Sequence, residues 1–299
     1  MNNINSTHRG GGTSANFWSW FSGGAILTYL GYFLLCAWSA LTLFSFGWVV
    51  ATSLKTNREV LAPKTIWALP KVPQFINFVT AWQRSKMGTY FFNSVVVTVS
   101  STLLIAVIAA MAAYILARFR FRGASLVLYY FLVGTAIPMH IIIVPIYLLY
   151  SGIGLLNSLI GLILVYTAVS LPFSVFVLTG FFRSLPHELE EAGVLDGASE
   201  STLFFRIVAP LAMPGIVTVS IFNALGIWND YLLAFMLMTS PEKRTIPVGL
   251  YNLKIVQTYA ADWVTLFAGV VIVLVPSVVI YLSLHRRITS GLTVGAIKG

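Results

Sequence analysis

The stretch SVVVTVSSTLLIAVIAAMAAYILA, residues 94–117, contains no aspartate, glutamate, lysine or arginine. About 20 consecutive apolar residues span the hydrocarbon core of a bilayer, and a charge at the centre of such a helix costs roughly 2.5–3.5 kcal/mol on insertion scales. The stretch is therefore typical of a transmembrane helix. Five further runs have the same character: residues 26–53, 126–150, 159–181, 215–238 and 264–284. Asp230, near the end of the fifth run, is the only residue of these four charged types within the six runs.

The composition of the whole chain agrees with this pattern. Of the 299 residues, 58% are hydrophobic and 9% are charged, and the mean hydropathy is +0.87. A soluble domain carries roughly 25% charged residues, so this chain lacks the charges to cover a soluble surface. The composition excludes a soluble enzyme, a disordered chain and a secreted disulfide scaffold, since Cys36 is the single cysteine. We predict an all-α integral membrane protein with six transmembrane helices.

The net charge of +9 does not indicate nucleic-acid binding. Basic residues are dispersed between the apolar runs, whereas binding to a phosphate backbone needs a clustered basic face. The densest cluster, Arg118, Arg120 and Arg122, directly follows the second run and fits a membrane-flanking position. Six spans place both termini on one side, and the short loop 118–125 together with the pair Arg286 and Arg287 favours the cytoplasm for that side.

The spacing of the runs divides the chain into three regions. We expect a cytoplasmic tail at 1–25, a six-span domain at 26–284 and a second cytoplasmic tail at 285–299. An outer loop at 55–90, rich in proline and tryptophan, suits short helices lying at the membrane interface. Within the third run, Pro138 and Pro145 predict interruptions of the helix.

An inner loop at 182–214 holds five of the nine acidic residues of the chain. Three glutamates follow Pro186 and would occupy the first turn of a helix, where the helix dipole favours anions. Asp196 and Gly197 predict a turn, and Ser199 is suited to cap a second helix that ends at Pro210. This pattern predicts a helix-turn-helix elbow that either enters a groove on a partner protein or lies at the interface with its acids solvated.

Family resemblance favours the first of these interpretations. Residues 191–198, EAGVLDGA, with Phe205, Ile207 and Pro210 after them, resemble the EAA loop of ABC importer permeases. The final residues 291–299, GLTVGAIKG, are similar to the tail of the carbohydrate, maltose-type branch. The resemblance extends over roughly residues 26–299. It implies a type I ABC importer permease architecture in the cell inner membrane, with cytoplasmic termini and sugars or oligosaccharides as cargo.

The same resemblance implies the partners and the residues that meet them. The partners are a second permease subunit in a heterodimer, a cytoplasmic ATPase dimer and an extracytoplasmic solute-binding protein. The tail residues Gly291, Gly295 and Lys298 would contact the ATPase, unless the tail is simply a disordered end. Coupling to the ATPase would involve Glu188, Glu190, Glu191, Ala192, Gly193, Asp196, Gly197 and Ala198. Gly193 stands where the family usually has alanine, which weakens the helix by about 1 kcal/mol.

No arrangement of residues indicates catalysis or a cofactor in this chain. The sequence has no phosphate-binding loop, no metal-ligand spacing and no pair of acids in the spans. We therefore expect no catalytic residue and no metal, with ATP and Mg²⁺ used by the partner ATPase.

Polar residues within the spans are the candidates for a substrate path. They are His140, Trp228, Asn229 and Asp230. Asp230 has a second interpretation, in which it lies at the outer boundary of the membrane and is solvated or pairs with Lys243 or Arg244. His140 has a packing role as its alternative.

Two other classes of function remain open at this point. An ion-coupled secondary transporter usually carries intramembrane carboxylates in both halves of an internal repeat, and here Asp230 stands alone. A non-transporting membrane scaffold would use the acidic loop only to recruit a partner.

Overall fold

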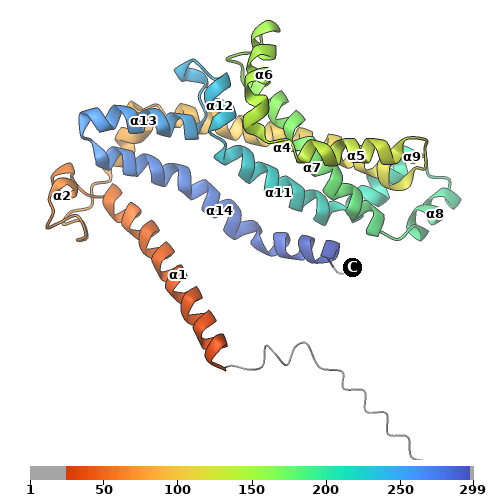
Figure 1. The fold of residues 1–299 in the computed structure, drawn as a ribbon, viewed down its shortest axis with the longest axis horizontal. Coiled ribbons are helices and arrows are strands. Elements are labelled where there is room, and N and C mark those ends of the chain that lie inside the picture. Colours follow the sequence, from red (N-terminus) through yellow and green to blue (C-terminus); the bar gives the residue numbers. More distant parts are fainter. Residues whose placement is uncertain (1–24, 297–299) are drawn as a thin grey trace, which may run out of the picture. The chain divides into compact units, whose positions relative to one another are not determined.

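The computed structural model describes the backbone of residues 25–296 and the side chains of residues 27–282 except residue 258. Within this range every regular element is a helix (Figure 1). The chain divides into two compact units, with the boundary between Val49 and Val50. Lys298 lies outside the described residues.

The described part of the first unit is helix α1 (Ala25–Ser53) as far as Val49. This helix contains no charged residue, and its long apolar stretch is sufficient to cross a membrane. Large apolar side chains such as Leu30, Phe33 and Trp38 are exposed, which is typical of a helix surrounded by lipid.

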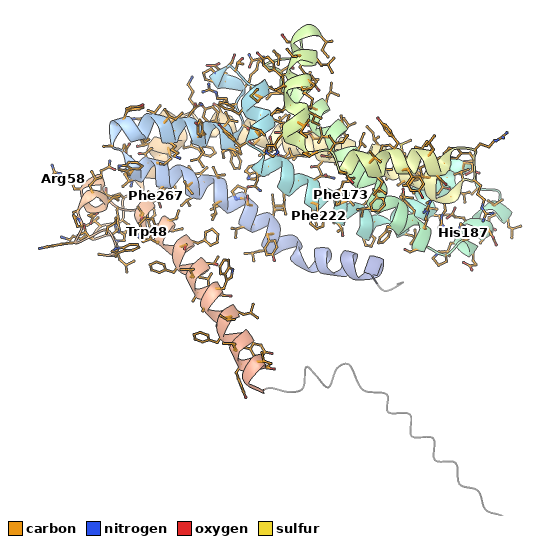
Figure 2. The ribbon with its side chains drawn as sticks, in the orientation of Figure 1. Trp48, Arg58, Phe173, His187, Phe222 and Phe267 are labelled. Carbon is orange, nitrogen blue, oxygen red and sulfur yellow. The ribbon has the colours of Figure 1, made fainter. Side chains whose placement is uncertain are left out.

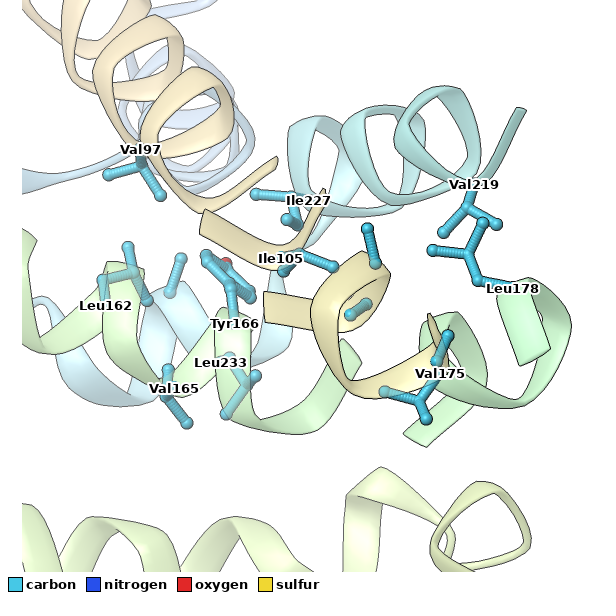
Figure 3. Packing of buried hydrophobic residues seen from close by; sticks show 14 of the residues in the cluster. Val97, Ile105, Leu162, Val165, Tyr166, Val175, Leu178, Val219, Ile227 and Leu233 are labelled. Carbon is cyan, nitrogen blue, oxygen red and sulfur yellow. The ribbon is translucent and has the colours of Figure 1, made fainter. Parts of the chain in front are cut away.

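The second unit is built around two long helices that pack along each other, α4 (Met87–Arg118) and α7 (Leu159–Ser184). Helix α11 (Met213–Asn229) packs against α4 and α14 (Trp263–Ala296). Small residues on α4 permit this close approach of the helices. Figure 3 shows Ile105 of α4 among Leu162, Val165, Val175, Leu178, Val219 and Ile227, all of them buried.

The third apolar run does not form one straight helix. Helix α5 (Ala124–Thr135) ends before Pro138, and α6 (Met139–Gly152) follows at an angle of 100°. Pro138 lacks an N–H group and disfavours helical geometry at the preceding residue, so the predicted interruption there is confirmed. The prediction for Pro145 is wrong, because this residue lies inside α6; membrane helices tolerate proline when neighbouring groups satisfy the freed carbonyl.

The fifth run is also divided, since α12 (Leu232–Leu237) follows α11 after a break at residues 230–231. Four described helices are long and apolar enough to cross a membrane, and two bent helix pairs raise this number to six at most. One of these pairs is α5 with α6. The other joins residues 200–211 to α11 at 72°. The all-helical membrane fold is confirmed, while the count of six spans stays a prediction.

The loop predicted at 55–90 contains the expected short helices, α2 (Asn57–Leu61), α3 (Ile76–Val79) and η2 (Thr80–Arg84). Its anchor is Lys55, whose buried ammonium group donates to the carbonyls of Thr65 and Ile66 at 3.1 and 2.7 Å. Burial lowers the pKa of Lys55 below its ordinary value of 10.5, and the carboxylate of Glu59 opposes part of that shift.

Between α12 and α14 the chain forms η4 (Pro241–Lys243) and α13 (Ile246–Ala260). Helix α14 then continues without interruption to Ala296. The region predicted as a separate tail from residue 285 is therefore helical in its backbone as far as the structure describes it. Gly291 and Gly295 lie within this helical segment.

Candidate functional site

The acidic loop forms the predicted elbow, which we call the acidic elbow and define as residues 185–212. Its first arm is α8 (Glu188–Leu195), and its second arm contains α9 (Glu200–Thr202), η3 (Leu203–Val208) and α10 (Ala209–Leu211). The three glutamates occupy the first turn of α8, as expected. His187 marks the start of this arm in Figure 2, far from Arg58 at the opposite end of the second unit.

The turn between the two arms has the geometry of a standard helix ending. Gly197 has φ +79°, a region that glycine adopts without strain. Its N–H donates to the carbonyl of Val194, and the N–H of Ala198 donates to that of Gly193, both at 3.0 Å. These two bonds form a Schellman motif. Both the predicted Asp196–Gly197 turn and the predicted cap are confirmed, since the Ser199 hydroxyl accepts the N–H of Thr202 at 3.4 Å.

The second arm differs from the prediction in its last turns. Residues 203–208 form a π-helix, and the helical backbone continues past Pro210 to Leu211. The helical segment thus ends one residue later than expected, at Leu211, before the bend of 72° into α11. Single π-helical turns recur at functional sites of proteins.

Gly193 sets the distance between the two arms. A Cβ atom at this position would lie 2.6 Å from Cδ2 of Leu203 and 2.8 Å from Cδ1 of Ile207. The missing side chain therefore lets α8 pack directly on η3. This contact explains why a glycine that weakens the isolated helix is compatible with a fixed elbow.

The acidic residues of the elbow separate into two groups by their surroundings. Glu188, Glu191, Asp196 and Glu200 are exposed. Two large apolar side chains of α8 are also exposed, Val194 by 57% and Leu195 by 87%. Apolar side chains with an acidic rim are typical of a surface that binds another protein. Ala192 and Gly197 are exposed on the same arm, and Ala198 is half-buried.

Glu190 belongs to the second group. Its Oε1 lies 2.6 Å from Nε of Arg118, the last residue of α4, and the two side chains are only 15% and 3% exposed. The Arg118 guanidinium also donates to the carbonyl of Leu185 at 3.0 Å and lies 3.0 Å from Nε2 of His187. A cavity of about 480 Å³ adjoins this cluster and is bordered by Tyr114.

Sequence reasoning missed this role of Arg118. Its position after an apolar run indicated only a membrane flank, because its partners lie about 70 residues later in the chain. Glu190 and Glu191 are identical residue types at adjacent positions. The sequence therefore gave no signal that Glu190 is covered and Glu191 is exposed.

The four residues predicted for a substrate path do not share one site. His140 is exposed at the start of α6. Trp228 is buried, with its ring edge-to-face against Phe91 at 5.5 Å. Asn229 is exposed and borders a cavity of about 430 Å³ that Tyr231 and Tyr251 also line.

Asp230 joins two parts of the fold. Its Oδ2 accepts the hydroxyl of Tyr166 at 2.7 Å and the N–H groups of Leu233 and Ala234 at 3.1 and 3.3 Å. The carboxylate thus caps α12 and connects it to α7. Among the described residues, no ion pair joins this carboxylate to Lys243 or Arg244, the partners of the second interpretation.

Comparisons with known proteins agree with this architecture. Residues 102–293 match the family described as "Binding-protein-dependent transport system inner membrane component". A diacetylchitobiose uptake system permease protein of Streptomyces coelicolor is 40% identical over 265 residues, covering 89% of this chain and 87% of the relative. A sulfoquinovosyl glycerol transport system permease protein of Agrobacterium fabrum is 34% identical over 257 residues, covering 86% and 89%.

A solved structure has the same fold. It is a bacterial ABC transporter involved in the import of the acidic polysaccharide alginate, and it superimposes with a TM-score of 0.74. The alignment covers 87% of this chain and 96% of that chain at 20% sequence identity. At this identity the likeness concerns the fold, which includes several helices able to cross a membrane.

Proposed function

The chain belongs to the family of binding-protein-dependent transport system inner membrane components, and from this membership we propose that it is a permease subunit of an ATP-driven importer for sugars or oligosaccharides. The sugar class is supported by the names of relatives, which transport diacetylchitobiose and sulfoquinovosyl glycerol. The membership favours neither an ion-coupled secondary transporter nor a non-transporting scaffold.

The family membership implies an ATPase and a solute-binding protein as partners. We propose in addition that the second permease subunit is a different chain and that both termini are cytoplasmic. ATP and Mg²⁺ then act in the partner ATPase, and this chain contributes no catalytic residue. We propose a further contact with the ATPase at Gly291, Gly295 and Lys298. The six spans at residues 26–284 would form half of the translocation pathway.

The observation that carries the coupling proposal is the exposed tip of α8. Leu195 is 87% exposed beside Glu191 and Asp196, and a large apolar side chain in such a position gains free energy only when a partner covers it. A groove on the ATPase with basic edges matches an apolar surface with acidic edges. Closure of the ATPase dimer then displaces α8, and the spans change between inward-facing and outward-facing states. Ligand and nucleotide each bias that equilibrium.

The test uses the double variant Glu191→Ala with Gly197→Pro in the complete transporter reconstituted in proteoliposomes. Proline cannot adopt φ +79°, so the turn between the arms is lost together with one carboxylate of the rim. We expect insertion into the membrane to persist while ATP-dependent sugar uptake is lost. Arg58→Gln is the control, because this arginine is exposed in α2, at the opposite end of the second unit from the elbow (Figure 2).

Full ATP-dependent uptake by the double variant would refute the coupling role of the elbow. Uptake by the unmodified protein that continues without ATP and stops without an ion gradient would instead identify a secondary transporter. Recruitment of a partner with no uptake under any condition would identify a scaffold.

A further inference from the structure

We propose that Arg118 is the positioning residue that transmits movement of the acidic elbow to helix α4, and that the adjacent Glu190 and Glu191 have different roles because the first is covered and the second is exposed. This inference rests on the proposed function, since it concerns how coupling reaches the spans. Glu191 remains at the surface for the partner, whereas Glu190 faces inward and holds Arg118.

Burial distinguishes this pair from the other ion pair of the described residues. Lys86 and Glu242 are 54% and 67% exposed at 3.4 Å, and exposed pairs of this kind contribute little to stability. Arg118 and Glu190 are nearly covered. Nε of Arg118 and Oε1 of Glu190 make no hydrogen bond among the described residues, so the opposite charge at 2.6 Å is what compensates each of these buried atoms. Removal of one partner would leave a buried charge without compensation.

The shape of the guanidinium explains why arginine occupies this position. Arginine offers five N–H donors in a planar fork, and here the three nitrogens face three different groups of the elbow: Nε faces Glu190, Nη1 faces His187 and Nη2 donates to Leu185. Glu190 lies in the first turn of α8, and Leu185 and His187 lie in the short segment that directly precedes it. The positive charge also lies at the C-terminal end of α4, where the helix dipole favours a cation.

These contacts attach α8 to a helix that is distant in sequence. Covalent continuity joins α8 to α7, but only non-covalent contacts join it to α4. Apolar contacts between α4 and the second arm, such as the ring of Tyr114 at 5.1 Å from that of Phe204, are not directional. The ion pair and its neighbouring hydrogen bonds fix both distance and orientation, so a displacement of α8 moves the end of α4 with it.

The test compares Arg118→Gln and Glu190→Gln with Arg122→Gln in the reconstituted transporter. Arg122 is an exposed arginine four residues from Arg118 and is the matched control. The readout is the number of sugar molecules imported per ATP hydrolysed, together with co-purification of the ATPase. We expect Arg118→Gln and Glu190→Gln to retain ATPase binding and hydrolysis and to lose at least about fivefold in this ratio, the lower range of coupling between sites. The control should retain the ratio.

Arg118→Lys separates geometry from charge, because lysine keeps the charge without the fork. We expect an intermediate ratio for this variant. If unmodified protein imports sugar and Arg118→Gln and Glu190→Gln both keep its ratio, the inference is refuted while the proposed function stands. If unmodified protein shows no ATP-dependent import, the proposed function fails first. Loss of ATPase binding in Glu190→Gln would show that Glu190 itself contacts the ATPase. The assignment of Glu190 to Arg118 and of Glu191 to the partner would then be wrong.

Discussion

Removal of the Asp230 carboxylate tests whether this residue maintains the fold at the break between α11 and α12. Asp230→Ala removes three acceptor contacts at once, those with Tyr166, Leu233 and Ala234. Loss of a helix cap costs about 0.5–2 kcal/mol, and a hydrogen bond to a charged group contributes about 1.5–3 kcal/mol. We expect the free energy of unfolding to fall by about 2–5 kcal/mol on these two contributions.

Tyr166→Phe removes one of these contacts and leaves the ring in place. Tyr166 is 4% exposed, so its hydroxyl has no access to bulk water. Interhelical hydrogen bonds in membranes average about 0.6 kcal/mol and reach about 1.7 kcal/mol. We expect a loss near the upper value, because the acceptor is a carboxylate. Tyr129→Phe is the matched control, since the Tyr129 side chain is exposed and its loss should be below about 0.5 kcal/mol.

The assay is equilibrium unfolding in detergent of the two single variants and their double variant. Residues in direct contact show coupling energies of about 0.5–3 kcal/mol, whereas independent sites add within about 0.3–0.5 kcal/mol. Additive losses for Tyr166→Phe and Asp230→Ala would contradict the contact. A raised KM for sugar uptake with unchanged stability in Asp230→Ala would show that the carboxylate serves the substrate path instead.

Two further predictions concern other parts of the second unit. Gly249→Ala would place a Cβ atom against the ring of buried Tyr90, and we expect it to lower stability by about 1–3 kcal/mol in a thermal melt; Gly226→Ala, with open space at its Cβ, should not. Hydrogen bonds from backbone N–H groups, that of Thr56 above all, hold the pKa of Glu59 below its ordinary value of 4.5. The charged form therefore stabilises α2, and we expect this contribution to be complete above pH 4.5 and lost as the pH falls through the lowered pKa. A lower protection factor of the Thr56 amide at low pH, relative to its intrinsic exchange at the same pH and absent in Glu59→Gln, would show this; pH-independent protection in the unmodified protein would contradict it.

Local patterns predicted those features that depend on neighbouring residues in the sequence. The Gly197 turn follows from the conformational freedom of glycine, and the Ser199 cap follows from the preference of hydroxyl groups for the start of a helix. The break at Pro138 follows from the missing N–H group. Each of these involves groups within about five residues of each other, so a single sequence contains the whole signal.

Contacts between distant residues were not accessible in the same way. Tyr166 and Asp230 are separated by 64 positions, and Arg118 and His187 by 69. An aspartate within an apolar run indicates that some partner exists, but its identity depends on which helices pack together. The continuation of α6 through Pro145 is of the same kind, because tolerance of a proline depends on neighbouring helices.

The two ends of α4 connect the elbow to the opposite end of the second unit. At its first turns, the Asn93 amide donates to the carbonyls of Glu242 and Arg244 at 2.8 and 3.0 Å, and the Ser94 hydroxyl accepts the N–H of Ile246 at 2.8 Å. Directional polar contacts thus hold α4 to the α12–α13 segment at one end and, through Arg118, to the elbow at the other.

Helix α4 is also suited to transmit movement over its length. It has 32 residues, about 48 Å at 1.5 Å per residue. Helices α7 and α14 both contain an internal proline, Pro172 and Pro276, and proline is a principal cause of helix kinks. Helix α4 contains none. Helix α4 is therefore less prone to bend than α7 or α14. A displacement applied at Arg118 then moves the whole of α4 and reaches the segment before α13. On this basis, loss of the Arg118 contacts should reduce movement at residues 242–246 even though those residues lie at the other end of the helix.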